Sequence, residues 1–438
     1  MTSPRFSLIF FILSSVFIVF NGGYLAREFK LFPYQFYNEA AQGWTQLRAQ
    51  QSEKLPWFYI RTNKQQDKVI KNISQTQPGL RLVTEIAAER SILAKIIDLN
   101  GNTLHKWEID WFKIWSNPEH LPKNLVPQAK PGTSIHGAVV MNNGDLVFNF
   151  ESKGLVRLNL DGEVIWRLPY LTHHSIHQHD DGNLWVSGTK YQTEKVSRLP
   201  NLIPPFYEET ILEITPEGKI AREWYVADIL RRNGYTGLLY LGSLNNENTA
   251  IQGDNRLLGN TDLLHLNDVE PFSAKLQSGF FQPGDVMISL RNINTVLVFN
   301  VETEKIKYIS TGEFVRQHDP DFIDGDTFSV FDNNNNNAPS SQRRSQIVVV
   351  SAKDNTSKVF FEGSKDNPFF TRVMGKHQWQ PNGNLSITES MSGRGFEIDR
   401  QGNVVWEYIN YVEPSIVGVV SEVQRLPLEY TELFTKEE

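Results

Sequence analysis

The feature that most constrains the fold of this chain is an internal repeat. From about residue 79 onwards, a short strand, a turn containing Asp, Asn or Gly, and a second strand that often carries Trp recur. The turns lie near residues 98, 159, 215, 300, 353 and 399. Such turns between alternating apolar residues predict β-hairpins. Six units of roughly 50 residues, each with about four strands, predict an all-β, six-bladed β-propeller.

The repeat and its interruptions also predict the structural roles of three other segments. The long interval between the turns near residues 215 and 300 predicts an insertion at about residues 228–258. Residues 417–428 are predicted to join the first unit and close the ring, which would leave no free sheet edge. The Asn run at residues 333–337 predicts a mobile surface loop. A β-sandwich or a solenoid is the alternative architecture.

The N-terminal residues have a different composition from the repeat. A mostly apolar run extends from Phe6 to Phe20, and the charged residues Arg27 and Glu28 follow it. Its length fits the hydrophobic region of a signal peptide and, counted on to Ala26, approaches the ~20 residues that span a bilayer. We expect residues 1–30 to be an uncleaved membrane anchor, with a cleaved signal peptide as the alternative.

The segment after the apolar run is predicted to be a stem at residues 31–75, followed by the propeller domain at residues 76–438. Residues 36–61 have the pattern of an amphipathic helix, which either forms the stem or packs on the domain. We expect the domain to be exported, on the periplasmic side of the inner membrane if the source is a bacterium. The oligomeric state stays open.

The composition excludes several classes of function. The 438 residues include 43 basic and 50 acidic side chains, a net charge of -7, without a long Lys/Arg run, which argues against a nucleic-acid partner or an anionic membrane surface. The chain has no Cys, so it has no disulfide, no thiolate nucleophile and no Cys-ligated zinc. Any chemistry must therefore use His, Arg, carboxylates, Tyr or a cofactor, and we predict no cofactor.

Histidines recur at one position in the repeat. Eight of the ten lie in segments that precede turns of the repeat, and His105 and His120 lie outside them. The innermost strands of a propeller line its central channel, so histidines at the start of these strands would converge at one mouth. The alternative is that they only hydrogen-bond to neighbouring blades. The strand-start histidines are His136, His174, His265, His318 and His377.

Three further histidines surround His174. Strand alternation leaves His173, His177 and His179 as candidates to face solvent. Imidazole is a good zinc ligand, so a His-only metal site at residues 173–179 is an alternative. The chain has no HExxH motif, and we predict no metal.

Several of these histidines belong to an ordered series of short motifs. The motifs lie at residues 173–176, 181–185, 264–270, 288–292, 317–320, 331–333 and 393–397. Over roughly residues 80–430 the series resembles the bacterial arylsulfate sulfotransferase family. Members of that family are periplasmic six-bladed propellers that transfer a sulfuryl group between phenols without a nucleotide sulfate donor.

The resemblance implies roles for the matching residues. His318 matches the nucleophilic histidine, which forms a transient sulfohistidine. His265 matches a histidine that contacts the sulfuryl oxygens or handles the phenol proton, and Arg291 matches the arginine that binds those oxygens. His174 matches a histidine from an earlier blade. The predicted substrate-binding residues are Asn267, His173 and His377.

The same residue types suit sulfuryl transfer on chemical grounds. Like phosphoryl transfer, it needs a positioned nucleophile and positive donors around anionic oxygens. Imidazole titrates near neutrality, so one His can attack while another moves a phenolic proton. We therefore predict an arylsulfotransferase-like enzyme with an aryl sulfate donor and a phenolic acceptor. The alternatives are a non-catalytic propeller that binds a glycan or protein at the channel mouth, and a quinone-cofactor propeller suggested by the Trp repeats.

Overall fold

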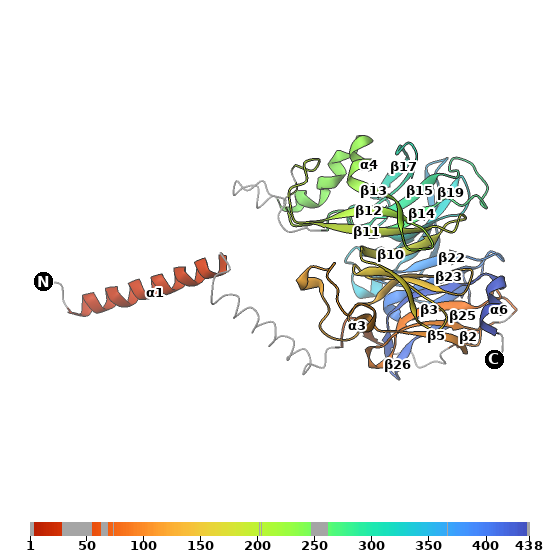
Figure 1. The fold of residues 1–438 in the computed structure, drawn as a ribbon, viewed down its shortest axis with the longest axis horizontal. Helices are drawn as coiled ribbons and strands as arrows, with labels where there is room; N and C mark the ends of the chain where they lie inside the picture. The colour runs from red at the N-terminus through yellow and green to blue at the C-terminus, as the bar shows by residue number, and fades with distance from the viewer. Residues whose placement is uncertain are drawn as a thin grey trace. The chain divides into compact units, whose positions relative to one another are not determined.

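The computed structural model describes residues 4–28, 55–62, 69–72, 74–200, 202, 204–246, 262–365 and 367–435. It divides the chain into two units, Met1–Trp57 and Phe58–Glu438. The second unit, which we call the β unit, consists mainly of antiparallel sheets (Figure 1). It begins at Phe58, whereas the sequence predicted a domain that begins at residue 76.

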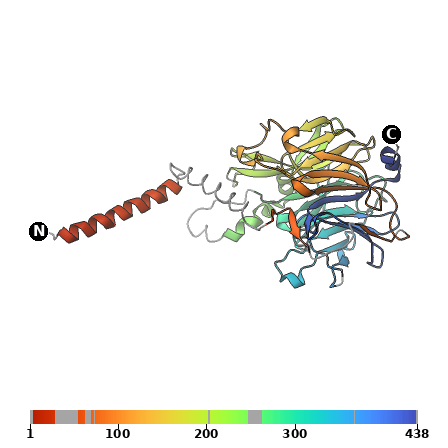
Figure 2. The same ribbon diagram turned by 90° about the horizontal axis from the view of Figure 1, so that it is seen from below.

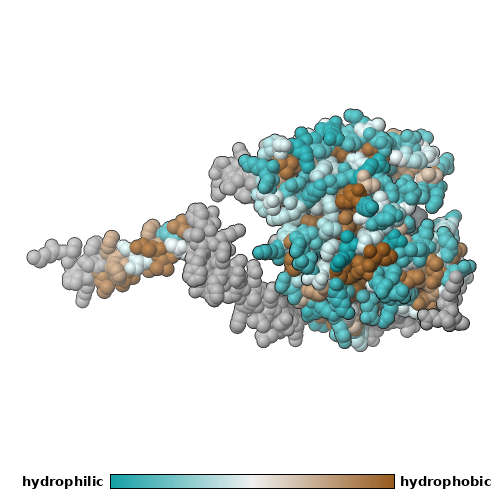
Figure 3. Space-filling view, in the orientation of Figure 1, coloured by the Kyte–Doolittle hydropathy of each residue, from teal (hydrophilic) through white to brown (hydrophobic). Residues whose placement is uncertain are grey.

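The described part of the first unit contains the helix α1 (Pro4–Glu28). Its segment Leu8–Leu25 is long and apolar enough to cross a membrane, and its apolar side chains are exposed (Figure 3). A signal sequence has the same properties, so the helix is compatible with both N-terminal alternatives. Most of the predicted amphipathic helix at residues 36–61 lies outside the described residues, and its last three residues form a strand instead.

Six sheets of four or five strands carry the repeat. The first three are β28 (Val420–Arg425), β3 (Arg81–Ile86), β4 (Ile92–Ile97) and β5 (Thr103–Ile109); β6 (Ile135–Val140), β7 (Leu146–Phe150), β8 (Gly154–Leu158) and β9 (Val164–Leu168); and β10 (Leu171–Gln178), β11 (Leu184–Gln192), β12 (Phe206–Ile214) and β13 (Ile220–Tyr225). The other three are β14 (Leu266–Pro271), β15 (Asp285–Leu290), β16 (Thr295–Asn300) and β17 (Ile306–Thr311); β18 (His318–Phe322), β19 (Thr327–Asp332), β20 (Gln346–Ser351) and β21 (Thr356–Glu362); and β22 (Lys376–Trp379), β23 (Leu385–Glu389), β24 (Arg394–Ile398) and β25 (Val404–Ile409), with β2 (Val69–Lys71) beside β25.

The first strands of the six sheets contact one another in a cycle. β28 contacts β6, β6 contacts β10, β10 contacts β14, β14 contacts β18, β18 contacts β22, and β22 contacts β28 again. Strands from the two ends of the chain, blue and orange, lie in one sheet in which β28 pairs with β3 (Figure 2). The predicted joining of the C-terminal segment to the first unit is therefore confirmed.

All six predicted hairpins are present, and each joins the third and fourth strands of a sheet. Trp side chains on the fourth strands connect neighbouring sheets. The indole N–H of Trp107 donates to the carbonyl oxygen of Asn159 at 2.8 Å, and that of Trp166 donates to the carbonyl oxygen of Pro216 at 2.9 Å. Trp406 donates in the same way to the carbonyl oxygen of Leu99, at 3.1 Å. The turn-and-Trp repeat thus encodes contacts between one sheet and the hairpin turn of the next.

Shorter elements surround these sheets. A small sheet contains β1 (Tyr59–Arg61), β27 (Ile416–Gly418) and β26 (Tyr411–Glu413). The predicted insertion contains most of α4 (Val226–Arg232) and the 3-10 helix η3 (Thr236–Asn246), and its residues 247–258 lie outside the described residues. The remaining helical segments are α3 (Trp111–Ile114), α6 (Thr431–Thr435), η1 (Ala88–Arg90), η2 (Lys123–Leu125), η4 (Arg291–Ile293), η5 (Ser340–Gln342), η6 (Ser390–Ser392) and η7 (Leu428–Tyr430).

Candidate functional site

Irregular strand pairing occurs where the first strands begin. The register of β10 with β11 shifts between His173 and Ile176, and that of β18 with β19 shifts between His318 and Asp321. Such irregularities break the alternation of side chains and redirect them. His174 and His265 have positive φ values of 57° each, which are uncommon for residues other than glycine. Sparsely populated backbone conformations of this kind cluster at functional sites.

The bulge in β10 explains an incorrect prediction. His173, which alternation placed as a candidate to face solvent, is buried like its neighbour His174. His177 is also not free in solvent, because its Nε2 atom lies 3.1 Å from Oδ1 of Asp268 and its side chain is only 23% exposed. Side chains of a regular strand alternate between its two faces, but here the consecutive residues His173 and His174 are both buried because the strand is bulged.

Five imidazoles form one cluster, which we call the histidine group: His136, His173, His174, His265 and His318. The Nδ1 atoms of His173 and His174 are 2.8 Å apart, and the Nε2 atoms of His174 and His265 are 3.2 Å apart. The ring centroid of His174 lies 3.9 Å from that of His136 and 6.1 Å from that of His318. The structure thus brings together predicted residues from the starts of β6, β10 and β18 and from the residue before β14.

The protonation of His318 follows from its hydrogen bonds. Its Nδ1 atom lies 2.6 Å from Oδ1 of Asn333 and 3.2 Å from the carbonyl oxygen of Arg316. Because both neighbours are acceptors, Nδ1 carries the proton. The Nε2 atom accepts a long hydrogen bond, 3.3 Å, from the backbone N–H of Met374. The lone pair of His318 therefore lies on Nε2.

Asn333 is itself held in one orientation. Its amide nitrogen donates to the carbonyl oxygens of Thr371, at 3.0 Å, and Met374, at 2.7 Å, which leaves Oδ1 facing His318. Asn333 is fully buried, so the prediction that the Asn run belongs to a mobile surface loop is wrong for its first residue. The run follows β19 directly, and this position brings Asn333 beside the first strand of its own sheet.

The charge state of the histidine group is set mainly by burial. Burial, with the positive charge of Arg291 as the next cause, holds the pKa of His318 well below its usual range. Burial, followed by the neighbouring imidazoles, likewise holds the pKa of His174 well below its usual range. Burial also lowers the pKa of His136 to about 4, against the attraction of Glu151. These three rings are therefore neutral at neutral pH.

Arg291 is a cation whose charge acts on His318. It begins η4, and its backbone N–H donates to the carbonyl oxygen of His265 at 3.0 Å. Burial lowers the pKa of Arg291, opposed by the charge of Asp262, and the side chain stays protonated at neutral pH. Its buried Nε atom makes no hydrogen bond within the described residues. A guanidinium with an unused donor, whose charge acts on His318, is suited to hold an anionic group.

Asn267 and Ser175 line a small cavity together with His136, His174 and His318. The amide nitrogen of Asn267 donates to the carbonyl oxygen of Gln317 at 2.7 Å. Its buried Oδ1 atom has no hydrogen-bond partner in the part of the chain that the structure describes. Asn267 is thus positioned at the predicted site with a free acceptor rather than a free donor.

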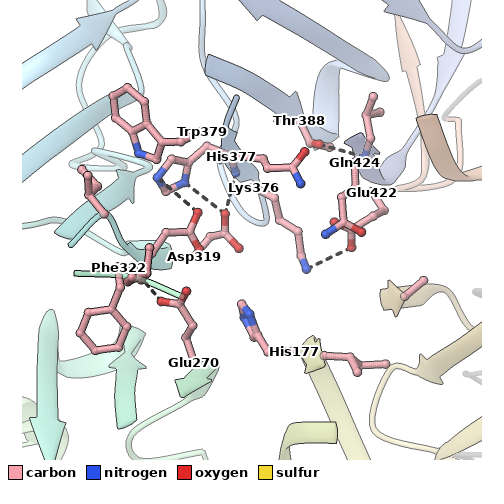
Figure 4. Close-up of a pocket in the computed structure, with 17 residues that line it drawn as sticks. His177, Glu270, Asp319, Phe322, Lys376, His377, Trp379, Thr388, Glu422 and Gln424 are labelled. Carbon is pink, nitrogen blue, oxygen red and sulfur yellow. Dashed lines mark hydrogen bonds and ion pairs between the residues drawn. The ribbon is translucent and has the colours of Figure 1, made fainter. Parts of the chain in front are cut away.

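His377 belongs to a second polar cluster, next to the histidine group. Its Nδ1 atom lies 3.1 Å from Oδ2 of Asp319, and its Nε2 atom lies 2.7 Å from the hydroxyl of Ser329. It lines a cavity of about 340 Å³, which we call the acidic cavity (Figure 4). The other titratable side chains that line this cavity are His177, Glu270, Asp319, Asp321, Lys376 and Glu422.

The acidic cavity contains a group with the composition of a cation site. One ligand atom each from Asp319, Asp321 and His377 lies within 4.8 Å of the others. Both ring nitrogens of His377 already have partners, which leaves the imidazole poorly placed to bind a metal. The predicted alternative of a His-only site at residues 173–179 is not assembled, because His177 pairs with Asp268 and His179 pairs with Asp181 at 3.1 Å.

Sequence reasoning missed three residues that contact the histidine group. They are Asn333 beside His318, Asp262 beside His265, and Glu209 beside His173. Asp262 lies three residues before His265. This spacing does not indicate a contact unless the turn between the two residues is known. Glu209 lies on β12, in the middle of a strand without any motif. Only Asn333 was part of a recognised motif.

Comparisons with known proteins identify the family of this chain. The model of a family described as arylsulfotransferase (ASST) matches residues 137–411. A search of curated proteins finds no match. Among solved structures, a protein of unknown function from Bacteroides caccae is 13% identical, covers 79% of this chain and 100% of its own, and has a TM-score of 0.49.

Two further structures illustrate the range of similar folds. The β-propeller domain of Cps50 (Swd1) from Myceliophteria thermophila is 8% identical over 81% of this chain and 89% of its own, with a TM-score of 0.40. A catalytically inactive virginiamycin B lyase from Staphylococcus aureus is 10% identical over 78% of this chain and 88% of its own, with a TM-score of 0.38. The family match alone covers more than half of the chain, and on that basis this protein belongs to the arylsulfotransferase (ASST) family.

Proposed function

We propose that the β unit is a six-bladed β-propeller that transfers a sulfuryl group from an aryl sulfate to a phenolic acceptor through a sulfohistidine at His318. Six sheets whose first strands contact one another in a cycle support the blade count. Family membership supports chemistry of the sulfotransferase kind. The observation that carries the proposal is the protonation of His318, whose Nδ1–H is held by Asn333 and whose lone pair lies on Nε2.

In the first half-reaction, Nε2 of His318 attacks sulfur while the bond between sulfur and the phenolic oxygen breaks. The hydrogen bond from Met374 to Nε2 must open for this attack. Positive charge then develops on the imidazole ring, and Oδ1 of Asn333 stabilises it by accepting from Nδ1–H. In the second half-reaction, the oxygen of an acceptor phenol attacks sulfur and Nε2 leaves. This sequence predicts ping-pong kinetics.

Arg291 supports the same reaction by charge. It remains positive while His136, His174 and His318 are neutral, so it is a permanent cation available to the sulfuryl oxygens. Donors that are fixed in place before the reaction stabilise an anionic transition state without reorganisation. By lowering the pKa of His318, the same charge also keeps the nucleophile unprotonated.

We also propose that α1 anchors or exports the protein. Its apolar, exposed segment Leu8–Leu25 supports this placement. If the source is a bacterium, the β unit would work on the periplasmic side of the inner membrane. Small aryl sulfates and phenols would be its partners, and its acidic composition gives no reason to expect nucleic acid.

The test is detection of the covalent intermediate. The purified protein is mixed with 4-nitrophenyl sulfate in the absence of an acceptor, quenched and analysed by peptide mass spectrometry. A sulfo group is expected on His318 and should disappear when phenol is added. The variant His318→Asn should lose both the adduct and the transfer, whereas His179→Asn, which changes a histidine outside the histidine group, should keep them. Absence of the adduct with several aryl sulfates would favour a binding module instead.

A further inference from the structure

Three imidazoles of the histidine group form a continuous chain between two carboxylates. Oε2 of Glu209 lies 3.4 Å from Nε2 of His173, whose Nδ1 atom lies 2.8 Å from Nδ1 of His174. On the other side of His174, its Nε2 atom lies 3.2 Å from Nε2 of His265, whose Nδ1 atom lies 2.5 Å from Oδ2 of Asp262. Each imidazole thus uses both of its nitrogens, one toward each neighbour in the chain.

The number of protons in this chain follows from its contacts. Three hydrogen bonds, His173–His174, His174–His265 and His265–Asp262, each need one N–H proton, and three neutral imidazoles supply these three protons. The contact between Glu209 and His173 is an ion pair at 3.4 Å without a hydrogen bond, and it forms only when the imidazole is protonated. With both carboxylates ionised, this ion pair therefore requires one extra proton in the chain, as a single imidazolium.

The extra proton has two positions at the ends of the chain. If His173 is the imidazolium, it forms the ion pair with Glu209 and donates to His174, and His174 donates to His265. If His265 is the imidazolium, it donates to both Asp262 and His174, and His174 donates to His173. Moving one proton across each of the two N···N contacts interconverts these arrangements, so the charge moves from one end of the chain to the other.

The surroundings place the charge at the ends rather than at the centre. His174 is buried, stacks on His136, and has no carboxylate in contact, so an imidazolium there would be costly. Both end imidazoles face a carboxylate. The other groups that act on the chain are His136, with Glu151 3.8 Å from its Nδ1 atom, and the neutral His318 and cationic Arg291. The end at His265 is the more open one, with 19% of the side chain exposed.

We propose that the chain Glu209–His173–His174–His265–Asp262 is a proton relay for the sulfuryl transfer, an inference that rests on the proposed function. In the first half-reaction, the departing phenolate takes the proton that lies between the Nε2 atoms of His174 and His265, and all three imidazoles of the chain become neutral. In the second, the acceptor phenol returns one proton to the chain as its oxygen attacks sulfur. The complete cycle leaves the proton count of the chain unchanged, and Glu209 and His173 act as positioning residues at its far end.

The test is the dependence of rate on the leaving group, which a merely structural role would not change. A phenol of high pKa needs the proton in the transition state, whereas 4-nitrophenol leaves almost as well without it. For Glu209→Gln, we expect the release of phenol from phenyl sulfate to slow about 100-fold, and release from 4-nitrophenyl sulfate to slow less than about 10-fold. Asp262→Asn should give the same pattern.

The matched control is Glu208→Gln. Glu208 neighbours Glu209 on β12, but its side chain pairs with Arg198 and Gln192 outside the chain of imidazoles. Glu208→Gln should slow the release of phenol from both substrates by the same factor or not at all. Thermal unfolding of each variant shows whether it is folded, and if Glu209→Gln does not fold, His173→Gln takes its place in the comparison.

The two proposals fail in different ways. If the wild-type protein forms no sulfohistidine with any aryl sulfate, the proposed function is wrong. If it forms sulfohistidine and Glu209→Gln slows phenyl sulfate and 4-nitrophenyl sulfate by the same factor, the relay is wrong and the function stands. A selective loss on phenyl sulfate, with adduct formation retained, supports both.

Discussion

The side-chain oxygen of Asn333 lies 2.6 Å from Nδ1 of His318, and two backbone carbonyls prevent its amide from turning over. A neutral acceptor at this position fixes the tautomer without adding charge. His265, in contrast, has the carboxylate of Asp262 at its Nδ1 atom. Two histidines of one cluster thus have partners of different charge, which suits one to be a neutral nucleophile and the other to carry a proton.

Replacing the neutral partner of His318 by a charged one should shift its titration. In Asn333→Asp, a carboxylate at Nδ1 favours the imidazolium and raises the pKa of His318, so less neutral nucleophile is present at pH 7. We expect kcat/KM to fall about 10- to 100-fold at pH 7 and to recover as the pH rises. Initial rates over a pH series measure this. Asn336→Asp, on the exposed part of the same run, should leave the profile unchanged, and an unshifted profile for Asn333→Asp would contradict the assigned contact.

Loss of the positive charge of Arg291 should also raise the pKa of His318. Because Arg291 lowers the pKa of His318, Arg291→Gln should raise that pKa and move the acid limb of kcat/KM to higher pH. It should also raise KM for the aryl sulfate, since a donor to the sulfuryl oxygens is lost. Arg291→Lys should bring the pH profile back to that of the wild type but should restore KM only in part, because a lysine supplies the charge without the planar fork of donors. If both variants show the wild-type pH profile, the charge of Arg291 does not act on His318.

The ion pair between His177 and Asp268 should make stability depend on pH. Burial lowers the pKa of His177, but the charge of Asp268, its hydrogen bond to the ring and the charge of Glu270 together outweigh burial and raise the pKa to about 9. A group with a raised pKa stabilises the fold fully below its unfolded pKa of about 6.5, and this contribution, about 3 kcal/mol, is lost as the pH rises to about 9. Denaturant unfolding at pH 6 and pH 9 should therefore differ less for His177→Gln than for the wild type. An equal difference would show that the pair does not titrate in this range.

The first and last units of the repeat are linked by a buried ion pair. Nη2 of Arg81, on β3, lies 2.9 Å from Oε2 of Glu397, on β24, and both side chains are excluded from solvent. Burial lowers the pKa of Arg81 to about 10, opposed by Glu397, so the pair is charged at neutral pH. Arg81→Met should reduce the free energy of unfolding by about 3–5 kcal/mol because it leaves a buried carboxylate unpaired. The double variant Arg81→Met, Glu397→Met should be more stable than the single one in denaturant titrations, and additive effects would contradict this coupling.

Much of the fold could be predicted from local patterns. Each hairpin turn, and the Trp that follows four of the six, were visible because turn residues and alternation are encoded within about ten neighbouring residues. The same regularity located the histidines at the starts of the first strands, as observed for His136 and His318. The boundary of the β unit was less predictable, because β1 and β2 pair with strands more than 300 residues later in the chain.

By itself, the sequence determined the repeated hairpins, the apolar N-terminal helix and the residue types that gather at the first strands. Only the tertiary structure decided which of these residues touch. The bulge that buries both His173 and His174, the contact of Asn333 with His318, and the chain from Glu209 to Asp262 depend on how sheets pack side by side. Periodicity records which face of a strand a residue occupies, but contacts between residues of different strands are set by the register, twist and spacing of the sheets.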